Sequence, residues 1–153
     1  MTLLVLRIVS GGQTGVDRAA LDAAIRHGVP HGGWCPRGRL AEDGTVPARY
    51  ELRETASWDY AERTEKNVID SDGTLILNTG SLDGGSLLTR EFAKEHRRPW
   101  RLVDLEDGLD PGKLREWLRS RGIRVLNVAG PRESKRPGIY ALATTALDQL
   151  LTA

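Results

Sequence analysis

The chain has a single cysteine, Cys35, and its 153 residues hold no long apolar run. One thiol excludes an internal disulfide and a zinc site built from cysteines. The apolar runs fall short of the about 18 residues that a membrane-spanning helix needs, and residues 3–9 are too few for the core of a signal peptide. The formal net charge is only +1, which gives no electrostatic argument for a nucleic-acid partner or an anionic membrane. We therefore expect a cytoplasmic protein that binds neither nucleic acid nor membranes.

Strand and helix signals alternate along the chain, which predicts one α/β domain over residues 1–153 with a mostly parallel sheet of about five to six strands. The expected strands are residues 3–9, 32–35, 49–55, 73–77, 100–105 and 124–128. The expected helices are residues 17–27, 57–70, 86–96, 110–121 and 138–151. Ser57, Ser86 and Asp110 are expected to cap helices, and Trp100 and Trp117 to lie in the core.

Glycine-rich turns follow three of the expected strands, over residues 10–17, 78–86 and 127–138. The carboxyl ends of parallel strands lie on one edge of a sheet, and ligands bind there. Turns that lead into helices direct backbone N–H groups and the positive end of the helix dipole at one place, which favours an anion. Each turn taken alone is also explained by chain reversal. Taken together, the three turns predict a pocket for a phosphorylated or otherwise anionic small molecule.

The candidate ligand-binding residues are small, hydroxyl-bearing, charged or aromatic. They are Gly11, Gly12, Gln13, Thr14, Gly15, Asp17, Trp34, Arg37, Gly84, Gly85, Ser86, Gly130, Arg132, Glu133 and Ser134. Asp17 has two interpretations: a carboxylate that stabilises a helix start by about 0.3–1 kcal/mol, or an acceptor for an N–H or hydroxyl group of a ligand. Trp34 stands at a strand end beside the glycine loops and offers a surface on which a flat ring stacks. The Arg37–Arg39 segment is either a second anion clamp or solvated surface.

No residue set predicts a defined reaction. Five carboxylates are candidates for a general acid or base: Asp17, Glu42, Asp43, Glu54 and Glu133. None of them has a nucleophile at a sequence spacing that indicates a catalytic pair. The three histidines show no metal-ligand spacing, so no metal site is expected. Arg63 and Asn67 share one helix face, which is turned either to the pocket or to water. The sequence also lacks the GxxxxGK[ST] loop of P-loop nucleoside triphosphatases.

Six motifs together resemble the putative molybdenum carrier family, also described as a circularly permuted YpsA-type branch of the SLOG superfamily. The motifs are Ser10-Gly-Gly-Gln-Thr-Gly-Val-Asp17, His31-Gly-Gly-Trp-Cys-Pro36, Glu42-Asp-Gly44, Arg63-Thr-Glu-x-Asn67, Asp70-Ser-Asp-Gly-Thr74 and Asn127-Val-Ala-Gly-Pro-Arg-Glu-Ser134. The resemblance implies a Rossmann-like, three-layer fold and a homo-oligomer, either a dimer or a tetramer. It also implies that the glycine loops bind a nucleotide-derived molecule or the molybdenum cofactor, which is a pterin with a phosphate and a metal held by a dithiolene.

Binding of an anionic, phosphate-bearing small molecule is the function that these observations predict, with a molybdenum cofactor carrier as the specific form. The alternatives are a nucleotide-processing enzyme similar to phosphoribohydrolases and a nucleotide-sensing domain. Related phosphoribohydrolases carry a PGGxGTxxE loop. Here the second loop reads Asp83-Gly-Gly-Ser-Leu-Leu-Thr-Arg90 and has no glutamate at the matching place, which disfavours hydrolysis.

The first glycine turn yields a prediction about Gly12. If its missing side chain faces the ligand, Gly12→Val abolishes ligand binding and leaves the fold largely intact, because the clash falls on the ligand side of the turn. A binding titration together with a urea-unfolding curve measures both effects, and normal binding would reduce the first loop to a turn.

Overall fold

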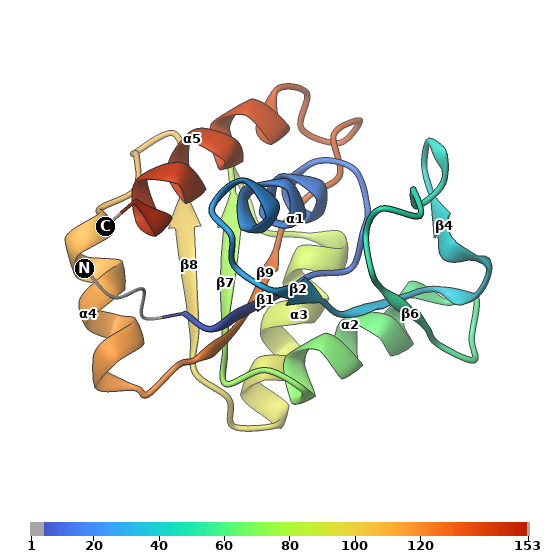
Figure 1. The fold of residues 1–153 in the computed structure, drawn as a ribbon, viewed down its shortest axis with the longest axis horizontal. Coiled ribbons are helices and arrows are strands. Elements are labelled where there is room, and N and C mark those ends of the chain that lie inside the picture. The colour runs from blue at the N-terminus through green and yellow to red at the C-terminus, as the bar shows by residue number, and fades with distance from the viewer. Residues whose placement is uncertain (1–4, 153) are drawn as a thin grey trace.

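The computed structural model describes residues 5–152 and contains a central sheet of five parallel strands (Figure 1). In sheet order these are β2 (His31–Gly32), β1 (Arg7–Val9), β9 (Val125–Ala129), β7 (Gly73–Asn78) and β8 (Trp100–Asp104). Every residue of β7 is buried, as expected for a central parallel strand that is covered on both faces. The edge strand β8 is partly exposed along its whole length.

Helices cover both faces of the sheet and complete a three-layer, Rossmann-like domain (Figure 1). On one face lie α1 (Val16–Arg26) and α5 (Ile139–Leu151), with α4 (Pro111–Ser120) next to α5. The other face carries α2 (Tyr60–Ile69) and α3 (Gly84–Glu95).

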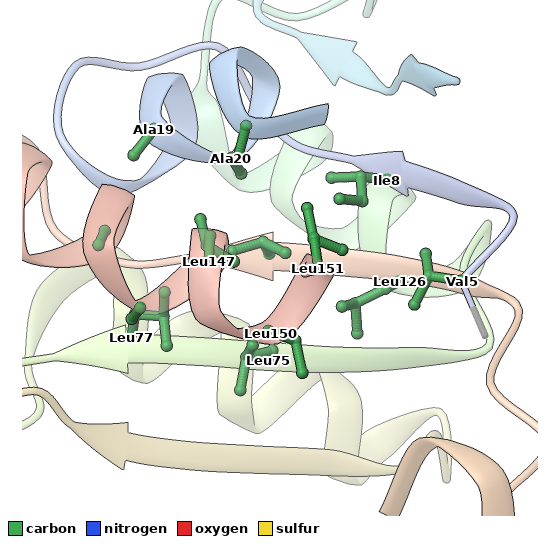
Figure 2. Packing of buried hydrophobic residues seen from close by; sticks show 14 of the residues in the cluster. Val5, Ile8, Ala19, Ala20, Leu75, Leu77, Leu126, Leu147, Leu150 and Leu151 are labelled. Carbon is green, nitrogen blue, oxygen red and sulfur yellow. The ribbon is translucent and has the colours of Figure 1, made fainter. Parts of the chain in front are cut away.

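The main core lies between the sheet and the α1 and α5 layer. Figure 2 shows Leu147 and Leu150 of α5 close to Leu75 and Leu126 of the central strands. Helix α1 contributes four fully buried alanines, which are Ala19, Ala20, Ala23 and Ala24. Because alanine is small, α1 packs close to both α5 and the sheet.

The order of the strands creates a crevice between β9 and β7. When the strands are numbered from β9 onward, through β1, β2, β7 and β8, the sheet order reads 3-2-1-4-5, as in a doubly wound dinucleotide-binding fold. The chain leaves β9 towards α5 on one face and leaves β7 towards α3 on the other. The carboxyl ends of these two neighbouring strands therefore separate, and this is the place where open α/β sheets bind ligands.

Residues 34–54 form an excursion beside the sheet, with its own small core. Strands β3 (Trp34–Cys35) and β6 (Arg53–Glu54) pair in parallel, and β4 (Leu40–Ala41) and β5 (Gly44–Thr45) form a hairpin after the short 3-10 helix η1 (Arg37–Arg39). The small core consists of Leu21, Cys35, Val46, Tyr50 and Leu52.

The guanidinium of Arg39 replaces regular strand pairing in this excursion. It donates to four carbonyl oxygens, those of Val46, Pro47, Tyr50 and Leu52, at 2.8–3.2 Å. The predicted strand over residues 49–55 is therefore reduced to the two residues of β6. Arg39 neither clamps a ligand nor extends into solvent, because its donors are used by the backbone of its own segment.

The predicted fold class is confirmed, and several local predictions need correction. The part of the first predicted strand at residues 3 and 4 lies outside the described residues. Asp59 rather than Ser57 caps α2, where it accepts from the N–H of Ala61 at 2.9 Å. Helix α3 begins at Gly84, so Ser86 lies inside its first turn and does not cap it.

Of the remaining predictions on helix caps and core tryptophans, two are confirmed and one is wrong. Asp110 caps α4 as expected, accepting from the N–H of Lys113 at 3.1 Å, and is followed by Pro111. Trp117 is in the core at 5% exposure. Trp100 is only partly buried, because β8 lies at the edge of the sheet.

Gly130 allows the end of β9 to approach β7 and α1 closely. A Cβ at this position would overlap the carbonyl oxygen of Leu77 and lie 2.5 Å from Val16 Cγ2. We expect Gly130→Ala to lower the free energy of unfolding by about 1–3 kcal/mol, because this packed junction cannot take a methyl group. Urea-unfolding midpoints measure the loss.

Gly112→Ala is the matched control, since Gly112 lies in α4 and the nearest atom to an added Cβ is Asp110 Oδ1 at 3.4 Å. This variant is expected to be unchanged or more stable by about 0.5–1 kcal/mol. Equal midpoints for the two variants would contradict the close-approach argument.

Candidate functional site

The three glycine turns border one cavity of about 400 Å³ at the carboxyl ends of β1, β7 and β9. The first loop contributes Gly11, Gln13 and Asp17, the second contributes residues 83–86, and the third contributes residues 127–132 together with Lys135. Helix α2 closes a further side through Tyr60, Arg63, Thr64 and Asn67. The predicted convergence of distant turns is therefore present, and it lies at the crevice between β9 and β7.

The amino end of α3 faces this cavity without a side-chain cap. Asp83 occupies the N-cap position, but its carboxylate binds Lys135 Nζ at 2.8 Å and forms no cap hydrogen bond. The hydrogen bond from Lys135 lowers the pKa of Asp83. The N–H groups of the first helical turn have no partner within a helix, which leaves those of residues 84–86 available to a ligand.

Ser86 adds a hydroxyl to the amino end of α3. The residue is only 6% exposed and lines the cavity, and within residues 5–152 its Oγ forms no hydrogen bond. Lys135 lies at the same end, with its Nζ 2.5 Å from the place where a Cβ on Gly84 would stand. Uncapped N–H groups, a free hydroxyl and an ammonium group together form a site suited to an anion.

The floor of the cavity carries a buried carboxylate beside a guanidinium. Asp17 is 6% exposed and accepts from the N–H of Gln13 at 3.2 Å. Arg63 Nη1 lies 3.8 Å from Asp17 Oδ2 and donates to the carbonyl oxygen of Gly11 at 2.7 Å. Burial raises the pKa of Asp17, and the nearby Arg63 opposes that shift.

The α2 face that carries Arg63 and Asn67 is turned inward. The Asn67 side-chain amide pairs with the backbone of Trp34, accepting from its N–H at 2.8 Å and donating to its carbonyl at 3.0 Å. Arg63 likewise binds backbone, through the carbonyl oxygen of Gly11 in the first loop. This face therefore attaches α2 to both β3 and the loop after β1. The alternative left open by the sequence is resolved in favour of the pocket.

Glu42, in the turn of the β4–β5 hairpin, links the first loop to the third. Its carboxylate accepts from the hydroxyl groups of Thr14 and Ser134 and from the N–H of Ser134 at 3.1 Å, and it lies 3.3 Å from Arg132 Nε. Burial acts to raise the pKa of Glu42, but the hydrogen bonds from Ser134 and Thr14 prevail and lower it. Gln13 strengthens the same junction by accepting from the N–H groups of Thr14 and Glu42.

The third loop is also tied to its neighbours. Arg136 donates to the carbonyl oxygens of Thr79 at 2.9 Å and Ser81 at 3.1 Å, which attaches the third loop to the second. Glu133 accepts from the N–H groups of Gly138 at 2.6 Å and Tyr140 at 2.9 Å, so its carboxylate caps the start of α5. The loops around the cavity therefore hold one another in place.

About half of the predicted site residues line the cavity. Those that do are Gly11, Gln13, Asp17, Gly84, Gly85, Ser86, Gly130 and Arg132. Those placed elsewhere are Gly12, Thr14, Gly15, Trp34, Arg37, Glu133 and Ser134. Thr14, Glu133 and Ser134 are engaged in the contacts just described, and a Cβ on Gly15 would overlap the carbonyl oxygen of Pro131.

The expected effect of Gly12→Val is corrected by the direction in which Gly12 points. A Cβ there would lie 2.7 Å from Leu52 Cδ1 and 3.0 Å from Val46 Cγ2, in the small core of the excursion. The backbone φ of +80° further disfavours a β-branched residue. Valine at this position therefore disrupts packing of the excursion rather than clashing with a ligand.

The Trp34 ring is already in contact with other side chains. Arg53 lies 4.6 Å and Lys66 4.4 Å from its ring centroid, and its Nε1 donates to Asp70 at 2.7 Å. Arg37 is exposed and lies 5.9 Å from the ring centroid of Trp58. Trp58, Tyr60 and Lys135 are among the lining residues that were not predicted as site residues. The sequence does indicate Lys135, because it lies in the third glycine loop. Nothing in the sequence around Trp58 indicates a site residue.

Of the acid and base candidates, only Asp17 lines the cavity. Glu54 lies outside the cavity and accepts from the N–H of Gly38 at 2.6 Å.

One group of described residues, Glu65, Glu95 and His96, is close enough together to hold a metal ion, on α2 and at the end of α3. The sequence spacing did not reveal this group, and His96 Nε2 already contacts Glu65 at 2.7 Å. In the part of the chain that the structure describes, no helix is long and apolar enough to span a membrane.

The family model of the circularly permutated YpsA SLOG family matches residues 8–151. The chain belongs to this family. The strand order agrees with its description, because the order 3-2-1-4-5 appears only when the strands are numbered from β9.

A solved structure extends the similarity to nearly the whole chain. The crystal structure of a "Putative molybdenum carrier protein" from Syntrophus aciditrophicus SB is 48% identical in sequence, with a TM-score of 0.93. The match covers 99% of this chain and 98% of that chain. No curated protein matches the chain.

The buried carboxylate of Asp17 predicts a defined dependence of stability on pH. A raised pKa means that the folded state prefers the protonated acid, so ionisation costs stability. Relative to Asp17→Asn, the wild-type protein is expected to lose stability as the pH rises from about 4, the unfolded value, through the folded pKa. Chemical unfolding at a series of pH values measures this difference, and a flat or opposite trend would show that Arg63 outweighs burial.

Proposed function

We propose that this protein binds an anionic, phosphate-bearing small molecule in the cavity between β9 and β7. The observation that carries the proposal is the uncapped amino end of α3, which faces the cavity with the unpartnered Ser86 hydroxyl and the Lys135 ammonium group beside it. Helix amino ends with free N–H groups and a nearby cation are common sites for phosphate groups. The position at the crossover of a doubly wound sheet supports the same conclusion.

The molybdenum cofactor is the specific ligand that we propose first, as cargo of a carrier. The name of the 48% identical protein from Syntrophus aciditrophicus supports this choice. The phosphate would bind at residues 84–86 with Lys135 and Arg132. Cys35 is fully buried in the small core of the excursion and does not line the cavity, but the cofactor needs no protein thiolate because its own dithiolene holds the metal.

A nucleotide is the second candidate ligand, and a hydrolase acting on it is the alternative function. One observation favours that function: Asp17 is a buried carboxylate in the cavity with a raised pKa, a common property of catalytic acids and bases. Glu133 does not serve in this way, since its carboxylate caps α5.

Native mass spectrometry of protein purified from its own host separates these possibilities, with a nucleotide turnover screen beside it. A retained pterin or nucleotide mass without turnover supports the carrier, whereas release of a nucleobase supports the hydrolase. If no ligand mass is retained and titration with AMP, ribose 5-phosphate and inorganic phosphate shows no binding, the proposal is wrong.

Arg132 and Lys135 are expected to contribute charge to phosphate binding. Arg132→Ala and Lys135→Ala should each weaken the binding of AMP by about 1.5–3 kcal/mol, roughly 10- to 150-fold, if each makes a charge-assisted hydrogen bond. Isothermal titration calorimetry measures the dissociation constants. Unchanged affinity in either variant would remove that residue from the site.

Arg119→Ala is the matched control for this comparison. Arg119 is an exposed arginine of α4 that pairs with Glu116 at 2.8 Å and lies outside the cavity. Its variant changes the net charge of the protein by the same amount as the test variants. If Arg119→Ala weakened the binding of AMP equally, the effect of the test variants would be explained by the change in net charge alone.

A further inference from the structure

Two largely exposed aromatic side chains line one part of the cavity. Trp58 is 68% exposed and Tyr60 is 50% exposed, and both line the cavity. Tyr60 is the first residue of α2, and Trp58 lies two residues before it. Pro36, Leu40 and Ala41 are further apolar residues that line the cavity. Large aromatic side chains left open beside a cavity mark a place where a partner or ligand covers them.

Tyr60 adjoins the amino end of α3. Tyr60 Cε2 lies 3.9 Å from the place where a Cβ on Gly85 would stand. A ligand group bound at residues 84–86 therefore has the Tyr60 ring beside it. The other tryptophan near the site, Trp34, does not line the cavity, and Arg53 and Lys66 already lie over its ring.

The size of the cavity limits which ligands can reach from the two aromatic side chains to the amino end of α3. At about 400 Å³ it lies near the lower end of the range of about 300–1,000 Å³ for small-molecule sites. That volume suits one ring system and one phosphate joined by a short linker. Asp17 also lines the cavity, and its carboxylate provides an acceptor for N–H or hydroxyl groups of such a molecule.

We propose that Trp58 and Tyr60 form a ring-binding subsite, so that the ligand is a compact monophosphate bearing a planar heteroaromatic ring. This inference rests on the proposed function, since it places the phosphate at α3. The ring stacks on Trp58 and Tyr60, and the phosphate reaches the N–H groups of residues 84–86. A ring of this kind stacks on indole and phenol faces with little dependence on its identity.

Calorimetric titration with AMP, GMP and ribose 5-phosphate tests the subsite. In the wild-type protein the tighter-binding nucleotide is expected to bind at least tenfold more tightly than ribose 5-phosphate, which has the phosphate and sugar without the ring. Trp58→Ala and Tyr60→Ala should each weaken nucleotide binding by about tenfold. Neither variant should change the affinity for ribose 5-phosphate.

Trp34→Ala is the matched control, with thermal unfolding of every variant to confirm that it is folded. Its nucleotide affinity should equal that of the wild-type protein. Equal affinity of the wild-type protein for nucleotide and ribose 5-phosphate would overturn the ring subsite and leave the proposed function standing. Nucleotide binding that depends on Trp34 instead of Trp58 and Tyr60 would also overturn it, whereas no binding of any phosphate probe contradicts the proposed function itself.

Discussion

The rest of the site depends on one constraint: the chain leaves the ends of the neighbouring strands β9 and β7 towards opposite faces of the sheet. Both strands lie in the middle of a parallel sheet, and their hydrogen bonds hold them side by side along their length. Beyond their ends, one connection passes to α5 and the other to α3, on opposite faces. Side chains of the sheet cannot fill the resulting gap, so the loops that surround it determine its chemistry.

Polar contacts join those loops to one another. Glu42 joins the loop after β1 to the loop after β9, and Lys135 and Arg136 join the loop after β9 to Asp83 and to carbonyl groups after β7. Charge-assisted hydrogen bonds fix geometry well, which matters where backbone N–H groups have to point at one place. The cations at the rim are already paired with carboxylates, so an anionic ligand would compete with Asp83 for Lys135 and with Glu42 for Arg132.

Much of the fold was predictable because local patterns suffice for it. The buried strand predicted at residues 73–77, the cap at Asp110 with Pro111, and the alanine-rich face of α1 each follow from side-chain size and hydrogen-bonding capacity. The caps of α2 and α3 were predicted two and three residues away from their actual places. In both cases a serine competed with a nearby aspartate, and only the surrounding contacts decide which residue stands at the helix end.

The sequence by itself determined the alternation of strands and helices, the parallel sheet and the placement of glycine turns at one edge, because these depend on periodicity and on the conformational freedom of single residues. Only the tertiary structure decided which turn residues face the cavity. Gly12 points into the excursion core while Gly11 borders Arg63, and Trp58 lines the cavity while Trp34 does not. The physical reason is that the direction of a side chain at a loop depends on contacts with segments far away in the chain, and local sequence carries no record of them.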